Sequence, residues 1–335
     1  MTELPATLRN ALIGLGLAEA GEALTATPLT GGVASDIWHV CAGGRDYCVK
    51  RALEKLKVER DWRVPTHRNA YEVAWMQTVG RIAPDCVPQV LGHDPQAGVF
   101  VMEYLPPSYY GNWKNELRNA VVDMEAVRAL ARLLAQIHNV TAGDMELAQR
   151  FDDGELFFQL RLEPYLHGAA VGNPDLRTAL EAIAAETART RLALVHGDVS
   201  PKNIMVGQGR IVLLDAECAC IGDPAFDLAF CLNHLLLNCL WVPAAREDFL
   251  AAYELLASNY LAAVGWEPAA GLAARAARLL PGLLLARVDG KSPVEYLDEP
   301  QRELVRAFAR EQLRAPAAAL DSLGAAWRQA LAAAG

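Results

Sequence analysis

The sequence predicts an α+β protein of two lobes, in which a small strand-rich N-terminal lobe precedes a larger, mainly helical C-terminal lobe. Strand and helix signals mix over the first hundred residues, and beyond Leu105-Pro106-Pro107 the chain becomes rich in Ala and Leu with helical periodicity. Hydrophobic residues make up 53% of the 335 residues and charged residues 21%, so the chain can bury a large core. We expect the lobes to span residues 1–104 and 105–335, with a hinge near 103–107.

The N-terminal lobe is expected to hold short strands and one long helix. Gly43-Gly44 is a natural hairpin turn between two strand-like runs. Thr66 is placed to cap a helix that continues to residue 81, because apolar side chains recur there at helical spacing. The predicted strands cover residues 25–32, 33–41, 45–52, 87–94 and 98–105.

The C-terminal lobe is expected to be helical with one exception. Residues 192–217 show the pattern strand, loop, strand, turn, strand, with a tight hairpin at Gly207–Gly209. A cleft between two lobes is a common place for a ligand, so the site is expected there. The predicted helices lie near 123–140, 155–167, 175–190, 224–240, 246–264, 268–286 and 298–333.

Charge argues against binding to a nucleic acid or to an anionic membrane. Lys and Arg number 31 against 40 Asp and Glu, a net charge of −9, and no basic block interrupts this balance. The uncharged stretch between Asp227 and Arg246 contains polar residues and a proline, so a buried helix explains it better than a bilayer span. The N-terminus lacks the basic start and unbroken apolar run of a signal peptide, and a cytoplasmic protein is expected.

Cysteine usage fits the same compartment. The seven cysteines are an odd number and form no C-x-x-C pair. Reduced, mostly buried thiols are therefore expected, ahead of a zinc site or a disulfide framework.

The segment His196-Gly197-Asp198-Val199-Ser200-Pro201-Lys202-Asn203 is the most informative part of the sequence. The catalytic loop of protein kinases reads H-R-D-L-x-x-x-N, and here only the Arg is replaced. Asp215 follows Asn203 at the end of a strand-like run, where a second magnesium ligand is expected. Phosphoryl transfer needs positioning and neutralisation of phosphate charge, for which amide and carboxylate oxygens around Mg²⁺ are suited. The alternative is that these polar residues only cap a turn.

HGDVSPKN and LLDAE resemble the H-G-D-x-x-x-x-N loop and I-D-x-E strand of the aminoglycoside phosphotransferase and choline kinase-like family, which has a bilobal protein-kinase-like fold. The resemblance covers about residues 24–290 and implies ATP and Mg²⁺ as cofactors. It implies Asp198 as catalytic base, Asn203 and Asp215 as magnesium ligands, and Glu217 as a weaker auxiliary ligand. It also implies that Asp227 braces the catalytic loop by hydrogen bonds.

The N-terminal lobe offers candidate nucleotide-binding residues. Gly31, Gly32 and Ser35 lie between two predicted strands, where a phosphate-covering loop belongs, although most such glycine pairs only make turns. Tyr47-Cys48-Val49-Lys50 is similar to the kinase strand whose Lys contacts the α- and β-phosphates. Its expected partner is Glu72 on the next helix, with Glu54 and Glu59 as competitors.

The run Val101-Met102-Glu103-Tyr104-Leu105 is similar to a kinase hinge. By that resemblance the Glu103 carbonyl and the Leu105 amide bind adenine. An ordinary edge strand is the alternative.

The departures from protein kinases favour a small-molecule hydroxyl acceptor. Gly197 replaces the loop Arg, and Asp215 and Asp227 are too close in sequence to enclose an activation segment. A protein kinase is disfavoured for that reason. A non-catalytic nucleotide-binding scaffold is disfavoured because Lys50, Asp198, Asn203 and Asp215 are all present.

The acceptor is expected to be a sugar or an amino alcohol ahead of a polycationic aminoglycoside, because acidic and basic residues are nearly balanced in the helical lobe. The N-terminal lobe and the spacing D-x-E-x₄-G-x₃-F-D, from Asp215 to Asp227, are similar to those of methylthioribose kinases. The loop around Asn203 differs from theirs, and Arg287 stands alone where they have paired arginines.

Two further segments have open roles. Residues 105–113 either line the acceptor site or pack the lobes together. Arg287, Asp289 and Lys291 either contact the acceptor or form a charged helix end.

Overall fold

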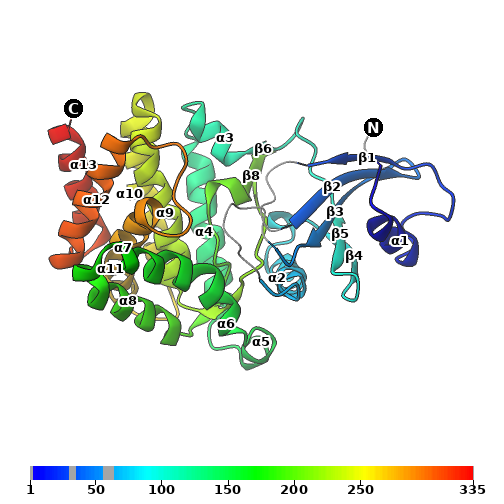
Figure 1. Cartoon of the computed structure of the whole chain (residues 1–335), viewed down its shortest axis with the longest axis horizontal. Helices are drawn as coiled ribbons and strands as arrows, with labels where there is room; N and C mark the ends of the chain where they lie inside the picture. Colours follow the sequence, from blue (N-terminus) through cyan, green and yellow to red (C-terminus); the bar gives the residue numbers. More distant parts are fainter. Residues whose placement is uncertain (1–2, 30–34, 56–63, 335) are drawn as a thin grey trace.

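A computed structural model of the chain describes residues 3–29, 35–55 and 64–334 and has the expected α+β architecture (Figure 1). An antiparallel sheet of five strands forms the N-terminal part, in the order β1-β2-β3-β5-β4. Helices form most of the rest. The strands of this sheet are β1 (Thr25–Pro28), β2 (Ser35–Ala42), β3 (Arg45–Ala52), β4 (Val90–Asp94) and β5 (Val99–Glu103).

The β2–β3 hairpin forms because its two-residue turn can adopt a left-handed backbone. Gly43 and Gly44 have φ of +56° and +73°, which is the conformation that a tight hairpin of this kind requires. The predicted turn is confirmed. In the resulting register Lys50 of β3 lies between Ile37 of β2 and Phe100 of β5.

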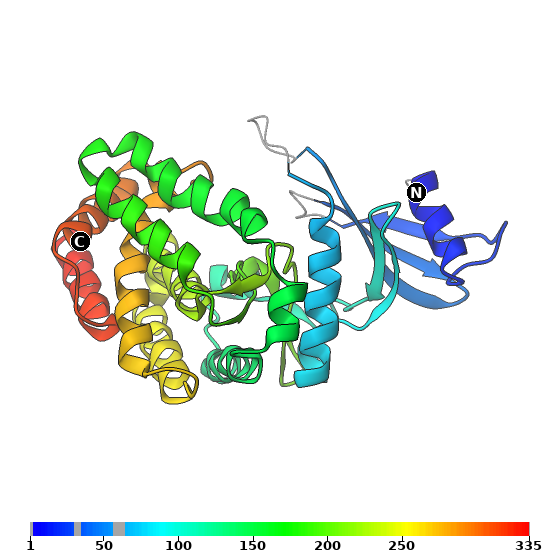
Figure 2. The same cartoon turned by 90° about the horizontal axis from the view of Figure 1, so that it is seen from below.

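Helices cover both faces of the sheet, as alternation along β3 requires. Tyr47 and Val49 pack with α1 (Ala6–Gly14), which the sequence pattern did not indicate. Cys48 faces the other side, in one cluster with Val73 of α2 (Arg68–Ile82). Two views show α2 standing between the sheet and the helical part (Figures 1 and 2).

The predicted cap of α2 is wrong in one detail. The helix begins at Arg68 after His67, and no side chain caps it. Thr66 contributes its backbone carbonyl instead, which accepts a hydrogen bond from the Asn69 amide at 3.2 Å. The first turn therefore closes through the main chain.

The C-terminal part contains the predicted helices with two differences. The region 298–333 is two helices rather than one, because Pro316 cannot continue a helix and the chain breaks after Arg314. The region 155–167 is a short α-helix followed by a π-helical segment that contains Pro164. The helices are α3 (Trp113–Arg118), α4 (Met124–Thr141), α5 (Met145–Arg150), α6 (Gly154–Phe157), the π-helical η2 (Phe158–His167), α7 (Gly168–Gly172), α8 (Arg177–Arg189), α9 (Pro224–Trp241), α10 (Arg246–Ala262), α11 (Ala269–Asp289), α12 (Glu299–Arg314) and α13 (Leu320–Ala334), with short 3₁₀ turns η1 (Pro84–Cys86), η3 (Pro174–Leu176), η4 (Pro201–Asn203) and η5 (Pro243–Ala245).

The strands inserted among these helices belong to two small sheets. The predicted hairpin at Gly207–Gly209 is confirmed, with Gln208 and Gly209 at φ of +52° and +72°. The strand before the loop does not join this hairpin and pairs with a later strand instead. The sheets are β6-β8-β9, made of β6 (Gly111–Asn112), β8 (Ile204–Gly207) and β9 (Arg210–Leu213), and β10-β7, made of β10 (Cys220–Gly222) and β7 (Ala193–Val195).

The apolar helix α9 is buried as expected. Sixteen of its 18 residues are buried, and the two that are not are His234 and Trp241. Helix α11 is long and apolar enough to cross a membrane, yet 61% of that stretch is buried against the rest of the protein, as in the core helix of a large domain.

All seven cysteines are free thiols. Cys48, Cys218, Cys220, Cys231 and Cys239 are buried, as the sequence predicted. Burial raises the pKa of Cys48 to about 12, so this thiol stays protonated and unreactive.

Candidate active site

Asp198 lies in a buried loop between β7 and η4. Two backbone amides of this loop are hydrogen-bonded to Asp227, at the start of α9. The backbone amides of His196 and Gly197 donate to the two carboxylate oxygens of Asp227, at 2.7 and 2.8 Å. The predicted brace is therefore confirmed. Asp227 is itself fully buried, so these charge-assisted bonds are shielded from water and hold the loop in one conformation.

Gly197 is required by this conformation. Its φ is +76°, where a residue with a side chain is strained. A Cβ added here would lie 2.9 Å from the Cys218 Sγ and 3.2 Å from the Cys218 carbonyl oxygen, too close for an ordinary contact. The protein-kinase Arg at this position would not fit.

Replacing Gly197 with Ala is expected to lower the free energy of unfolding by about 1–3 kcal/mol and to reduce turnover by displacing Asp198. Gly209→Ala is the matched control, because Gly209 has a similar φ of +72° but no atom within 4 Å of the added Cβ. Urea unfolding and initial rates would be measured for both variants. Equal effects on turnover would contradict the importance of close packing around Gly197.

Arg161 is the principal contact of Asp198, and the sequence did not single it out. Its Nη2 lies 2.9 Å from the Asp198 Oδ2, and Lys202 Nζ lies 3.3 Å from the same oxygen. Arg161 also donates to the carbonyls of Gly197 and Leu160. The guanidinium thus connects the carboxylate to the backbone of its own loop.

The charges around Asp198 determine its ionisation. Burial alone would raise its pKa, but Arg161 foremost and then Lys202 hold the pKa well below the usual aspartate range. Asp198 is therefore a carboxylate at neutral pH. Such a group binds and orients a hydroxyl, and it takes a proton only as that hydroxyl becomes acidic.

Arg161 reaches this position from η2, the π-helical segment. π-Helical turns are rare and frequently occur at functional sites. Nothing in the sequence marks Arg161, since it lies 37 positions before Asp198 in the printed numbering. Pro164 is the one local signal, because it interrupts the helical hydrogen-bonding pattern there.

Asn203 and Asp215 are brought to the same place by backbone hydrogen bonds between their loops. The Leu214 amide donates to the Asn203 carbonyl at 2.9 Å, and the His196 ring contacts the Leu214 carbonyl at 3.0 Å. The Asn203 Nδ2 donates to the Asp198 carbonyl at 3.1 Å, so its amide oxygen is the atom it offers to a ligand. Asp215 adopts a φ of +68°, an uncommon value for a residue with a side chain and one that often accompanies function.

Lys50 lies between two carboxylates, those of Glu72 and Asp215. Its Nζ is 2.8 and 2.7 Å from the two oxygens of Glu72, and it also contacts Asp215 Oδ1. Burial would lower the pKa of Lys50, but Asp215 and Glu72 raise it, so the ammonium stays charged. Burial raises the pKa of Glu72, and Lys50 opposes that shift. The structure thus joins β3, α2 and the loop after β9 through one cation.

A second buried ion pair ties α2 to the same loop. Arg68 Nε donates to Glu217 Oε2 at 2.9 Å, and its other nitrogens donate to the carbonyls of Val64, Pro65 and Leu53. The pairing of Glu217 with Arg68 favours a structural role for this carboxylate. Arg68 was not recognised in the sequence, since an Arg in the first turn of a helix is unremarkable.

The remaining predicted nucleotide-binding residues are less well defined. Gly31 and Gly32 lie outside the described residues, and Ser35 is the buried first residue of β2. Glu103 ends β5, and its amide donates to the Gln89 carbonyl at 2.8 Å. Leu105 is half-buried just beyond it.

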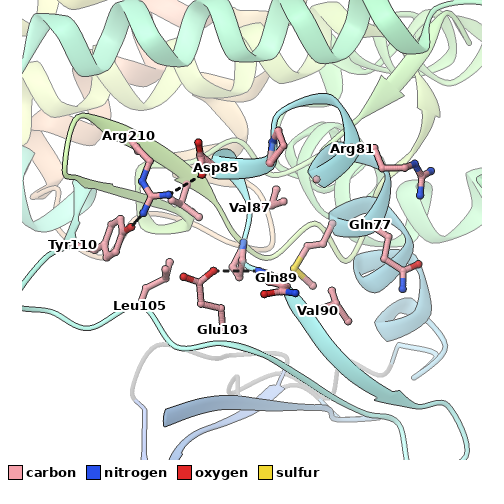
Figure 3. A pocket seen from close by; sticks show the side chains of 15 residues that line it. Gln77, Arg81, Asp85, Val87, Gln89, Val90, Glu103, Leu105, Tyr110 and Arg210 are labelled. Atoms are coloured by element: carbon pink, nitrogen blue, oxygen red, sulfur yellow. Dashed lines mark hydrogen bonds and ion pairs between the residues drawn. The ribbon is translucent and has the colours of Figure 1, made fainter. Parts of the chain in front are cut away.

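Glu103 and Leu105 also line a cavity of about 580 Å³ between α2, β4 and the β8–β9 hairpin (Figure 3). Arg210 points toward Asp85 and Tyr110 on one side of it, and Glu103 points toward Gln89 on the other. Lys50, Asp198, Asn203 and Asp215 are not among the residues that line this cavity.

The segment 105–113 mainly packs the two parts together. Tyr110 and Trp113 are buried, whereas Tyr109 is 59% exposed. The Asn112 Nδ2 donates to the Lys202 carbonyl at 2.7 Å, which connects this segment to the loop of Asp198.

No group of three His, Cys, Asp or Glu side chains in the described part of the chain forms a ready metal site. Mg²⁺ typically takes only one or two protein carboxylates and completes its coordination shell with water and phosphate oxygens. Asn203 and Asp215 fit such a partial set.

Residues 25–272 match the model of the phosphotransferase enzyme family. The chain belongs to this family. Over 240 residues it is 30% identical to a methylthioribose kinase of Pectobacterium atrosepticum, covering 62% of this chain and 58% of that protein. The chain therefore spans less than two thirds of the length of the curated relatives it matches.

Solved structures of the phosphotransferase family and its neighbours share the fold. An ethanolamine kinase of Plasmodium vivax superposes with a TM-score of 0.57 at 13% identity, covering 89% of this chain and 86% of that one. A choline/ethanolamine kinase family protein of Mesorhizobium loti gives a TM-score of 0.51 at 18% identity, over 96% of this chain and 99% of that one. The protein-kinase-like fold expected from the sequence is thereby confirmed.

Proposed function

We propose that this phosphotransferase-family protein moves the γ-phosphoryl group of Mg-ATP to a hydroxyl of a small molecule. The observation that carries this proposal is the cluster in which Lys50, paired with Glu72, contacts Asp215 beside the braced loop of Asp198. A buried lysine held between two carboxylates suits phosphate and metal binding, and the adjacent carboxylate suits a hydroxyl.

The residues take the following roles in this proposal. Asp198 orients the acceptor hydroxyl and receives its proton, and the nucleotide lies between the lobes 1–104 and 105–335. Mg²⁺, when bound with ATP, neutralises the charge on the β- and γ-phosphates. Asn203 and Asp215 hold the metal, with Glu217 as an auxiliary group; Gly31, Gly32, Ser35, Lys50 and Glu72 hold the phosphates; Glu103 and Leu105 hold adenine.

Transfer in this arrangement relies on positioning rather than on a strong base. Asp198 stays ionised because of Arg161, so it is a weak proton acceptor in the ground state. The hydroxyl loses its proton late, when its bond to phosphorus is forming. The Lys50 ammonium binds the phosphates of the nucleotide and offsets part of their negative charge.

The acceptor class in this proposal is a sugar or an amino alcohol. Its support is the 30% identity to a methylthioribose kinase, whose name states its acceptor. Fold similarity to choline and ethanolamine kinases leaves the acceptor open, since one fold serves many substrates. A cytoplasmic location remains a prediction from the sequence.

ATP is expected to stabilise the protein only when Mg²⁺ is present. A ligand at ~100 times its dissociation constant adds about 2.7 kcal/mol to the free energy of unfolding, which is several degrees of melting temperature for a protein of this size. Thermal unfolding would be followed with ATP alone, Mg²⁺ alone and both together. Asp215→Asn is the control and should lose the magnesium-dependent shift. A wild-type protein that shows no such shift and releases no ADP with any hydroxyl compound would refute the proposal.

A further inference from the structure

The two half-buried side chains of α9 point to a second feature beside Asp198. His234 and Trp241 are the only residues of this helix that are not buried, and they are two turns apart on the same face. The His234 ring lies 5.5 Å from that of Phe230, which in turn contacts the Arg161 guanidinium at 5.9 Å. The half-buried His234 is thus connected to the Arg161–Asp198 pair through the buried Phe230 ring.

Two aromatic rings and a lysine form the far end of this surface. Trp241 and Tyr296 stack with ring centroids 4.3 Å apart and planes 23° apart. Lys114 Nζ lies 5.7 Å from the Trp241 ring and 5.9 Å from the Tyr296 ring. Its ion pair with Glu295 is exposed and 3.3 Å long, so it is weak and easily exchanged for another anion.

Arg287, near the end of α11, is a cation whose side chain forms no ion pair within 4 Å with an acidic residue in the described part of the chain. Its guanidinium lies over the Tyr165 ring at 5.9 Å and donates to the carbonyl and hydroxyl of Ser292. Its buried Nε has no hydrogen-bond partner among the described residues. A buried donor of this kind normally has a partner, and a bound anion would provide one.

The neighbouring charged side chains behave differently from Arg287. Asp289 accepts hydrogen bonds from Arg306 and Asn173, and Lys291 is paired with Glu163. Those two residues belong to the charged end of the helix. Of the three residues singled out in this segment of the sequence, only Arg287 has a buried donor without a hydrogen-bond partner among the described residues.

His234 connects these groups electrostatically. Burial and then Arg287 lower the pKa of His234 well below the usual histidine value; Lys202 and Lys114 act in the same direction, and the Asp198 carboxylate opposes them. The ring is therefore neutral at pH 7 and can both donate to and accept from a hydroxyl. Around it stand three cations, Lys114, Lys202 and Arg287. The nearby carboxylates Asp198 and Glu295 already have the cationic partners Arg161 and Lys114.

We propose that this surface, formed by Lys114, His234, Trp241, Arg287 and Tyr296, binds the acceptor, and that the acceptor carries an anionic group. The anion lies between Lys114 and Arg287, an apolar face of the acceptor packs on the Trp241–Tyr296 pair, and the reacting hydroxyl points to Asp198. The inference rests on the proposed kinase function and specifies a sugar-like hydroxyl compound that carries one carboxylate or phosphate, which excludes a simple amino alcohol. A cationic acceptor would meet three positive side chains here.

Matched pairs of acceptors test this inference. Glycerol, glycerate and glycerol 3-phosphate would be compared, as would ribose, ribonate and ribose 5-phosphate, with choline and methylthioribose alongside. ADP release gives kcat/KM, and calorimetry in the presence of Mg²⁺ and a non-hydrolysable ATP analogue gives binding. The kcat/KM of an anionic compound is expected to exceed that of its neutral partner by about tenfold or more, since hydrogen bonds to charged groups are stronger than those between neutral groups. Comparison of the carboxylate with the phosphate derivative of each compound shows which of the two anionic groups the protein prefers.

Arg287→Met and Lys114→Met are expected to raise KM for the anionic acceptor about tenfold or more and to leave the Mg-ATP thermal shift unchanged. Lys291→Met is the matched control, because Lys291 is a nearby cation bound to Glu163, and it should keep the wild-type KM. If a neutral or cationic compound has the highest kcat/KM while the Mg-ATP shift is present, this inference is wrong and the kinase proposal stands. Failure of every anionic compound to react or bind, with ATP binding intact, also overturns it.

Discussion

Replacing Asp198 with Asn is expected to lower kcat by about 10²–10⁴-fold, the usual contribution of a general base. Mg-ATP binding should persist, because Lys50, Asn203 and Asp215 are unchanged. The amide keeps the shape of the side chain but loses the charge that faces Arg161 and Lys202. An acceptor hydroxyl then loses the anionic oxygens that orient it and its proton acceptor, since the amide offers one neutral oxygen and an NH₂ donor.

Asp215→Asn provides the contrast, because it removes a proposed metal ligand and the anionic contact of Lys50. That variant should lose both turnover and the magnesium-dependent thermal shift. Single-turnover rates and thermal unfolding would be measured for both variants. Retention of more than about a tenth of wild-type turnover by Asp198→Asn would contradict its assignment as the base.

Replacing Arg161 with Met is expected to have the second largest effect, on both stability and pH dependence. Removing one partner of a buried ion pair typically costs about 3–5 kcal/mol, because the other charge stays buried. The pKa of Asp198 should rise once its main cation is gone. An acid limb in kcat is then expected at a higher pH than in the wild-type protein.

The sign of the stability effect follows from the lowered pKa of Asp198. A carboxyl whose pKa is depressed by folding stabilises the protein above its unfolded pKa, about 3.9, and loses that contribution as the pH falls further. The gap between wild type and Arg161→Met should therefore be widest near neutral pH and narrow in acid. Urea unfolding at pH 7 and pH 3.5, and kcat from pH 5 to 9, would measure both effects.

Arg161→Lys is the companion variant, since it keeps the charge but loses the fork that reaches Asp198 and the Gly197 carbonyl together. It should recover part of the pH profile and less of kcat. A pH profile of Arg161→Met identical to wild type would show that the guanidinium has no influence on Asp198.

Short-range patterns were sufficient for much of the fold and for the choice of candidate site residues. The spacing from His196 to Asn203 and on to Asp215 identified the loop, because residues on one loop and the strand after it keep a nearly constant geometry. Gly43-Gly44 and Gly207–Gly209 identified hairpins, because few residues tolerate a positive φ. The part of α9 after Asp227 carries no charge and was recognised as buried for an equally local reason, the cost of exposing so many apolar side chains.

The partners of these residues were decided only by the tertiary structure. Arg161 meets Asp198, and Arg68 meets Glu217, across separations of 37 and 149 positions, and no local pattern distinguishes either arginine from one on a solvated surface. The pairing of β7 with β10, and the half-buried positions of His234 and Trp241 on a mostly buried helix, likewise follow from how whole elements pack. Sequence by itself determined which residues we propose for phosphate chemistry, because that choice depends on residue type and short spacing. Packing decided which charges face one another, because ion pairs and open surfaces depend on distances between segments that are far apart along the chain.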